Sequence, residues 1–304
     1  MMIKKLAVAV ACALIGAVAV TGQPTGEDLD RWALAHWDAV GTGTTDAVVA
    51  GFSPEGGVAF LGTPWDGLYH GADTAVAWDA FFAGLSVRGA VVTGVVRAVA
   101  EARLVYGALE LDTPEGTVVV ESFLQFSPDG LLRAADYVRI SAPNAVVPVA
   151  DGQILDGEYA RSAQDRATGV TLYWRNGLVV LFAALESPGT GWVSAGFDPE
   201  RRMQGANYII AAVPPAGLVI EDHFGSGPTS HRRDLREDIL RAEGAVSAGR
   251  TVVEFVIPLD SLDAEDKPLV PGQTYTVLLA YHRSSTSLSA IHTARGAVQM
   301  TLEE

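Results

Sequence analysis

The spacing of apolar side chains predicts two helices near the start of the chain. In residues 26–40 apolar positions recur every three or four residues, and acidic residues open the segment, as suits the N-terminus of a helix. Residues 73–82 repeat this pattern. The side chains expected to point inward are Leu29, Trp32, Ala33, Leu34, His36 and Trp37 in the first helix, and Ala75, Val76, Trp78, Phe81 and Phe82 in the second.

From residue 89 onward the pattern changes to that of β-strands. Turn residues at 112–116 and 127–130 stand where the chain must reverse, which makes these two connections hairpin loops. Helices followed by such a meander predict an α+β domain in which a curved antiparallel sheet wraps around the helices. The strands expected there are residues 91–99, 102–111, 117–126 and 131–140.

The second half of the chain has almost no helical periodicity. Asn176-Gly177 predicts a two-residue hairpin of type I′, because both residues tolerate positive φ. About nine short strands with turns at regular intervals predict an all-β sandwich or barrel. Those strands are residues 170–174, 178–185, 192–197, 206–213, 217–222, 239–245, 251–257, 274–281 and 298–302, and the charged stretch 231–238 is interpreted as a solvated loop.

Composition changes where the two halves meet. Two prolines and several small residues lie between the patterned regions, and we interpret residues 142–151 as a linker. The expected organisation is therefore an α+β domain over residues 26–141 and a β-sandwich over residues 152–304.

The first 22 residues have the order of parts of a secretory signal peptide. Lys4 and Lys5 precede an apolar run over residues 6–20, which is short for a membrane span, and cleavage after Gly22 is expected. A retained N-terminal anchor is the competing interpretation. Cleavage predicts a periplasmic or secreted protein. It would also remove Cys12, the only cysteine, so that neither disulfides nor thiolate metal sites are expected.

The net charge of −15 argues against nucleic acid and anionic membranes as partners, because both require a basic surface. Acidity keeps an exported protein soluble, and it suits a basic partner protein through electrostatic steering.

Three motifs in the second half carry a family resemblance. They are Gly191-Trp192-Val193-Ser194-Ala195-Gly196-Phe197, Arg202-Met203-Gln204-Gly205-Ala206-Asn207-Tyr208, and Ile291-His292-Thr293-Ala294-Arg295-Gly296. Their order and spacing resemble the DOMON family, in which Asn207 would commonly be an acid. The resemblance implies an immunoglobulin-like sandwich that binds either haem or sugars.

In haem-binding DOMON members, a methionine and a histidine at these places hold a b-type haem. Carried over, the iron ligands would be Met203 and His292, a pair that leaves no open axial position and suits one-electron transfer. His282 and His223 are rivals for the histidine role. Arg202 and Arg295, with Arg201, are candidates for pairing with the propionates. The candidate aromatic walls are Trp192 and Tyr208, with Trp174 and Phe197.

In the first half, Gly67-Leu68-Tyr69-His70-Gly71-Ala72-Asp73, followed by Trp78 and Phe81-Phe82, resembles the SnoaL-like (nuclear transport factor 2-like) cone fold. Some such folds use a pocket acid or histidine as a general base. The polar candidates are His36, Asp66, His70 and Asp136, but no fixed catalytic pattern is present, and an enzyme is not the expected function.

The sequence thus favours an exported haem b protein for one-electron transfer, fused to a ligand- or partner-binding cone domain. A membrane or periplasmic electron carrier would be its redox partner. The alternatives are a haem-free module that binds carbohydrate or another small ligand, and an enzyme with its active site in the cone pocket.

Overall fold

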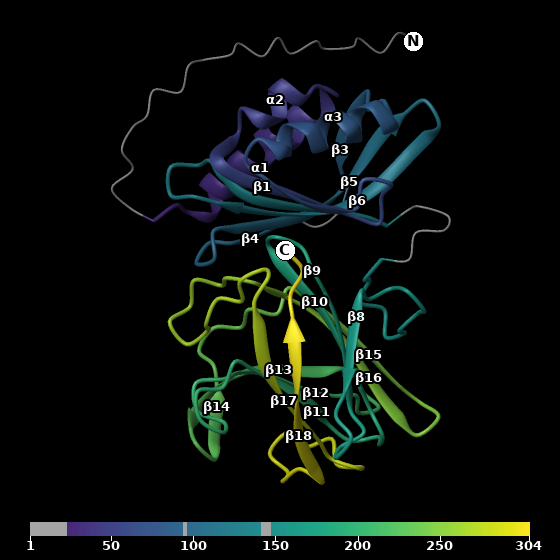
Figure 1. Ribbon diagram of the computed structural model, residues 1–304, viewed down its shortest axis with the longest axis vertical. Helices are drawn as coiled ribbons and strands as arrows, with labels where there is room; N and C mark the ends of the chain where they lie inside the picture. Colours follow the sequence, from purple (N-terminus) through teal and green to yellow (C-terminus); the bar gives the residue numbers. More distant parts are fainter. Residues whose placement is uncertain (1–22, 94–95, 141–146) are drawn as a thin grey trace.

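A computed structural model describes residues 23–93, 96–140 and 147–304 of the chain. The predicted signal peptide and Cys12 lie outside these residues. The described chain is mostly β-sheet with few helices, and it forms two β-rich parts, one above the other in Figure 1. None of the helices in these residues is long and apolar enough to cross a membrane.

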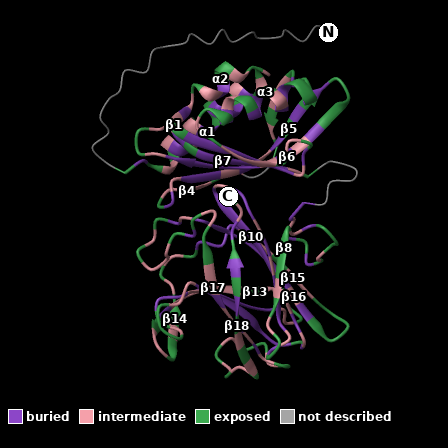
Figure 2. Ribbon diagram, in the orientation of Figure 1, coloured by how far each residue is buried: buried purple, intermediate pink, exposed green. Residues whose placement is uncertain are grey.

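Three helices lie in the first part. The two predicted helices are confirmed, and a short one stands between them: α1 (Gly26–Gly41), α2 (Thr45–Val49) and α3 (Asp73–Leu85). A capping box starts α1, where the backbone N–H of Asp28 donates to Oγ1 of Thr25 and the Asp28 carboxylate accepts from the N–H of Thr25. Leu34 and Val76, which were expected to point inward, are 46% and 64% exposed. Both helices carry exposed as well as buried residues (Figure 2).

A single sheet faces these helices, with strand order β2-β1-β7-β6-β5-β3 and β4 paired to β5. The sequence pattern indicated the meander but missed the first two strands. In β1, Ser53, Pro54 and Glu55 interrupt the apolar pattern, and the buried residues that follow do not alternate. The predicted strand at 91–99 is two short strands. The strands are β1 (Phe52–Leu61), β2 (Gly67–His70), β3 (Gly89–Val92), β4 (Arg97–Val99), β5 (Leu104–Thr113), β6 (Gly116–Phe126) and β7 (Leu132–Arg139).

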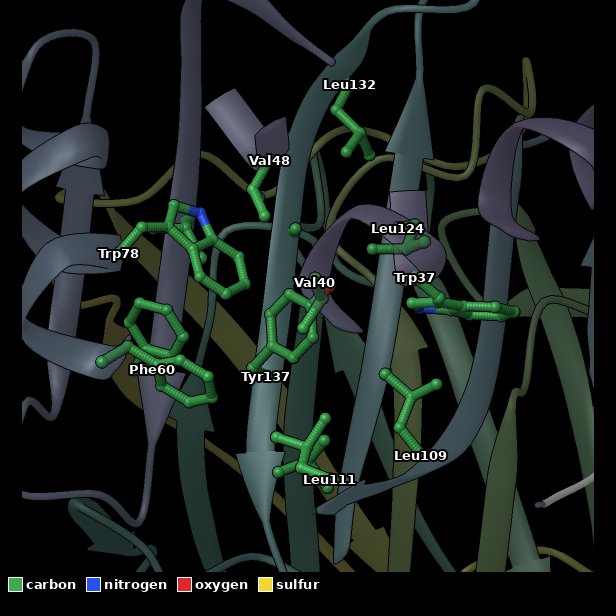
Figure 3. Packing of buried hydrophobic residues seen from close by; sticks show 14 of the residues in the cluster. Trp37, Val40, Val48, Phe60, Trp78, Leu109, Leu111, Leu124, Leu132 and Tyr137 are labelled. Atoms are coloured by element: carbon green, nitrogen blue, oxygen red, sulfur yellow. The ribbon is translucent and has the colours of Figure 1, made fainter. Parts of the chain in front are cut away.

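Aromatic rings fill the space between the helices and this sheet (Figure 3). The ring of Trp78, from α3, lies 5.0 Å from that of Phe60 on β1 and 5.1 Å from that of Tyr137 on β7. All three side chains are fully buried. Burial of rings of this size is the main favourable term that holds α3 on the sheet.

The second part is a sandwich of two antiparallel sheets, as the sequence predicted. One sheet has the order β15-β16-β10-β9-β8 and the other β14-β13-β12-β11-β17-β18. Their strands are β8 (Arg161–Gln164), β9 (Thr171–Asn176), β10 (Val180–Ser187), β11 (Val193–Phe197), β12 (Asn207–Ala212), β13 (Val219–Gly227), β14 (Ser230–Arg233), β15 (Arg241–Ser247), β16 (Arg250–Pro258), β17 (Thr274–Tyr281) and β18 (Ala294–Thr301).

Two local predictions in this part were wrong. Asn176 and Gly177 do not have the positive φ of a type I′ turn. The N–H of Gly177 donates to the carbonyl of Val180 at 3.0 Å, so the turn is centred on the next two residues, 178 and 179. The stretch 231–238 is only partly a solvated loop. His231 lies on β14, which pairs with β13, and Asp238 is 4% exposed.

The two parts share a buried apolar interface between the β5–β6–β7 face and the β10–β16 face. Phe123 of β6 packs edge-on against Phe182 of β10, with ring centroids 5.8 Å apart. Polar contacts surround this cluster, including the hydroxyl of Tyr106, which donates to the carbonyl of Leu240 at 2.9 Å. Of the predicted linker, residues 142–146 lie outside the described chain, whereas Val147 is buried in this interface.

Candidate functional site

A cavity of about 670 Å³ lies on the outer face of the six-stranded sheet. Directly paired residues of neighbouring strands share a face, and Ser194, Ile210 and Ala280 are paired on β11, β12 and β17. All three line the cavity. Their neighbours Val193 and Ile209 point the other way, into the sandwich core.

Apolar side chains occupy both faces of these central strands, which explains why they lack clean alternation. Trp192, Ala206, Tyr208, Ile210 and Ala212 form a buried cluster of their own on the outer side, separate from the sandwich core. An apolar outer face requires a cover, and two loops supply it, residues 198–206 before β12 and residues 282–293 before β18.

The first loop holds Met203 over the sheet. The N–H of Gly205 donates to the carbonyl of Gly225 at 2.8 Å, and the N–H of Gly225 donates to the carbonyl of Ala206 at 2.8 Å. A Cβ atom at position 225 would lie 1.8 Å from the carbonyl oxygen of Met203. Glycine at 225 therefore allows the Met203 loop to approach β13 this closely.

Of the residues that the sequence proposed for cofactor binding, six line this one cavity. Trp192 and Tyr208 form part of its buried wall, and Met203 and His292 are half-buried, one from each covering loop. Arg202 and Arg295 are exposed beside it.

Other residues considered at the sequence level lie elsewhere. Trp174 and Phe197 belong to the sandwich core, so they do not wall the cavity. His282 caps its own loop, where Nδ1 accepts from the backbone N–H groups of Ser284 at 3.1 Å and Ser285 at 2.8 Å. Arg201, His223 and His282 are not among the lining residues.

Sequence reasoning missed His231, which also lines the cavity. Its ring lies 5.8 Å from that of Tyr208, and its Nδ1 is 3.0 Å from Nδ1 of His223. His231 reaches the cavity because β14 pairs with β13. The charged composition of residues 231–238 hides this pairing in the sequence.

Two polar groups of the cavity wall are buried without a partner. Nε1 of Trp192 and the hydroxyl of Tyr208 make no hydrogen bond to any described residue. Burial also raises the pKa of the Tyr208 phenol, which is therefore neutral and a donor. Because an unpaired buried donor costs about 1–3 kcal/mol, the wall is suited to a ligand with acceptor oxygens.

The four polar candidates of the first part do not converge. His36 is buried on the helix side, where Nε2 is 2.8 Å from the hydroxyl of Tyr137, and burial lowers its pKa to about 3. Asp136, next to Tyr137 on β7, points to the opposite face, toward the second part. Asp66 pairs with Arg175 of the second part, and His70 is exposed at the end of β2.

Comparison with known proteins identifies residues 167–282 as a DOMON domain. Mouse DBH-like monooxygenase protein 1 is 30% identical over 112 residues, 36% of this chain and 18% of that protein. Its human counterpart is 26% identical over 92 residues, 30% of this chain and 15% of that protein. The chain therefore spans less than a fifth of the length of these relatives. The segment that matches the DOMON domain, residues 167–282, includes Met203 and ends before His292.

Solved structures with distant similarity align with less than half of this chain. BvnE pinacolase from Penicillium brevicompactum aligns with 38% of this chain and 84% of its own, at 17% identity and a TM-score of 0.32. A protein of unknown function with a cystatin-like fold from Methylobium petroleophilum PM1 aligns with 44% of this chain and 86% of its own, at 16% identity and a TM-score of 0.34.

Proposed function

Given the DOMON domain at residues 167–282, we propose that the chain is an exported b-type haem protein for one-electron transfer. Its N-terminal part is proposed to be a SnoaL-like domain that binds a small ligand or a partner. The observation that carries the proposal is the single cavity over the outer face of the DOMON sheet. That cavity is lined by Met203 and His292 together with Arg202 and Arg295.

The cavity suits haem in size and polarity. A volume of about 670 Å³ is within the range of roughly 300–1,000 Å³ that holds cofactor-sized ligands. Tyr208, Ile210 and Leu278 give it an apolar wall that would contact the apolar parts of the macrocycle. The unpartnered donors of Trp192 and Tyr208 require acceptors, and haem carries two carboxylates.

Each residue would contribute differently to holding the cofactor. Met203 and His292 would supply thioether sulfur and neutral imidazole, which are both adequate ligands for haem iron. Arg202 and Arg295 would pair with the carboxylates, since guanidinium groups bind carboxylates in two-pronged geometry. Haem held by two such ligands supplies a one-electron redox centre. The chain's own side chains would bind it, orient it and shield it from water.

The remaining features of the proposal concern location and partners. The full chain has a net charge of −15, and the exported protein would be acidic enough to meet a basic redox partner or membrane electron carrier outside the cytoplasm. The buried interface between the two parts would hold the proposed haem domain and the N-terminal domain as one unit.

Visible absorption spectroscopy tests the haem proposal. Protein from haem-replete cells, or apoprotein mixed with haemin, is expected to show sharp haem bands that shift on addition of dithionite. Met203→Ala and His292→Ala are each expected to give five-coordinate, high-spin iron. Met300→Leu in the sandwich core and His70→Ala on β2 are the matched controls, with spectra like that of the unmodified protein.

Two outcomes would contradict the proposal. Colourless protein that takes up no haemin would remove haem and leave the carbohydrate- or small-ligand-binding alternative. An unaltered spectrum in Met203→Ala would show that the sulfur is not a ligand.

A further inference from the structure

Three titratable side chains form a hydrogen-bonded row that ends at the cavity. Nε2 of His223 lies 2.9 Å from Oε2 of Glu221, and Nδ1 of His223 lies 3.0 Å from Nδ1 of His231. Glu221 and His223 are two residues apart on β13 and share a face, and His231 stands on the neighbouring strand β14. The His223 side chain is only 11% exposed.

The order of donors and acceptors in this row follows from the carboxylate. An ionised Glu221 can only accept, so Nε2 of His223 must carry the proton. A neutral His223 then has its lone pair on Nδ1, and Nδ1 of His231 must donate to it. The lone pair of a neutral His231 is therefore on Nε2, which no described residue hydrogen-bonds.

The ring of His231 borders the cavity. Its Nδ1 edge is turned toward His223, and the ring lines the cavity wall beside Tyr208. Burial lowers the pKa of His231, and repulsion from His223 lowers it further when that ring is protonated, so the neutral imidazole of His231 is favoured. A neutral imidazole oriented by a second histidine and a carboxylate is prepared to accept a proton.

We propose that Glu221, His223 and His231 form a proton relay that fixes His231, through Nε2, as the proton acceptor of the cavity, and that this nitrogen takes up a proton when a bound cofactor is reduced. The claim that His231 takes up a proton on reduction rests on the proposed haem function. The claim that the three residues form a relay concerns the chain alone.

The charge balance of the step is complete. One electron from an external one-electron donor, such as dithionite, passes to the cofactor, and one proton from solvent binds Nε2 of His231. No covalent bond breaks, and the added negative charge is offset by the imidazolium. Glu221 stabilises that positive charge through His223.

Other charged groups packed around these three side chains influence the pH at which His231 takes up a proton. On the β13–β14 side, Nη1 of Arg233 lies 3.6 Å from Oε1 of Glu221, and Arg233 also pairs with Glu237. On the cavity side, Arg202, His292 and Arg295 line the same space as His231. These three groups are either positive or able to become so, and they oppose a charge on His231 unless an anionic ligand offsets them.

Nitrogen-15 NMR of the full-length apoprotein tests the relay without haem. His231 is expected to carry its proton on Nδ1 and His223 on Nε2, with His231→Gln used to assign the signals. Glu221→Gln is expected to lower the pKa of His231, because it removes the charge that stabilises the imidazolium. A proton on Nε2 of His231 in the unmodified apoprotein would overturn the relay.

Redox titration between pH 5.5 and 8.5 tests the coupling. With haemin bound, the midpoint potential is expected to fall by about 59 mV per pH unit over part of this range, which corresponds to one proton per electron. His231→Gln should abolish that dependence, and His70→Gln should keep it. A potential independent of pH in the unmodified protein would overturn the coupling. Failure to bind haemin would overturn the proposed function and the coupling with it, and the NMR tautomers would then decide the relay alone.

Discussion

The carboxylate of Asp136 occupies the space where a side chain at position 177 would stand. A Cβ atom on Gly177 would lie 2.2 Å from Oδ2 of Asp136. The same carboxylate accepts from the backbone N–H of Leu178 at 2.7 Å, and from those of Val179 and Val180 at 3.0 Å each. One buried side chain of the first part thus holds the β9–β10 turn of the second.

Replacement of this glycine is expected to weaken that contact. Gly177→Ala forces the turn and the carboxylate apart, and overpacking of this kind costs about 1–3 kcal/mol of unfolding free energy. Urea denaturation measures the change. Gly26→Ala on α1, where a Cβ meets nothing within 4 Å, is the control and should be close to neutral. Equal stability of the two variants would contradict the steric argument.

Removal of the carboxylate leaves three backbone donors without an acceptor. Asp136→Ala is therefore expected to lower the unfolding free energy by about 3 kcal/mol or more. Asp136→Asn keeps one acceptor oxygen and should lose less. Limited proteolysis near residue 177 provides a second measurement, with faster cleavage expected in Asp136→Ala. If the alanine and asparagine variants lose the same amount, the three N–H bonds are not the cause.

Stability is expected to fall as the pH rises from 6.5 to 8.5. Burial raises the pKa of Asp136 and Asp266 to about 7 and that of Asp222 to about 9, so the folded state binds more protons than the unfolded state. A carboxyl group whose pKa is raised on folding stabilises the folded state fully below its unfolded pKa of 3.8. This stabilisation is lost as the pH rises through the folded pKa. The slope contributed by Asp222 approaches 1.4 kcal/mol per pH unit.

The range from pH 6.5 to 8.5 was chosen because a buried histidine has the opposite effect on stability at lower pH. The pKa of buried His36 is lowered to about 3, so His36 destabilises the fold only as the pH falls below its unfolded value of 6.5. Urea denaturation at pH 6.5, 7.5 and 8.5 measures the slope, and Asp222→Asn should reduce it. A rise in unfolding free energy across this range would contradict the prediction.

Gly196 provides a test of the cavity wall. A Cβ atom at this position would lie 2.3 Å from Cε1 of Tyr208, so Gly196→Ala must displace that ring. Haemin affinity is expected to fall about tenfold or more, equivalent to at least ~1.4 kcal/mol, as measured by absorption titration. Gly89→Ala on β3, whose nearest contact would be 3.9 Å away, is the control and should keep the affinity.

The fold was predictable where local pattern and burial coincide. The segment at 26–41 was predictable because its cap and its period are both local features, and the meander from β5 to β7 follows from alternation and turn residues. β1 was missed because apolar and polar side chains do not alternate in its segment Gly57–Val58–Ala59–Phe60. It also pairs in parallel with β7, which lies far along the chain. Long-range pairing of this kind leaves no local signal.

The sequence by itself determined the sandwich, its DOMON motifs and the six residues that line one cavity. Motif spacing carries this information because each motif sits at a fixed place on a strand or loop. Tertiary structure alone decided that Asp136 serves the interface and that His231 reaches the cavity. Hydrophobic pattern indicates which residues are buried, but the partner of a buried polar group is set by which strands and domains pack together.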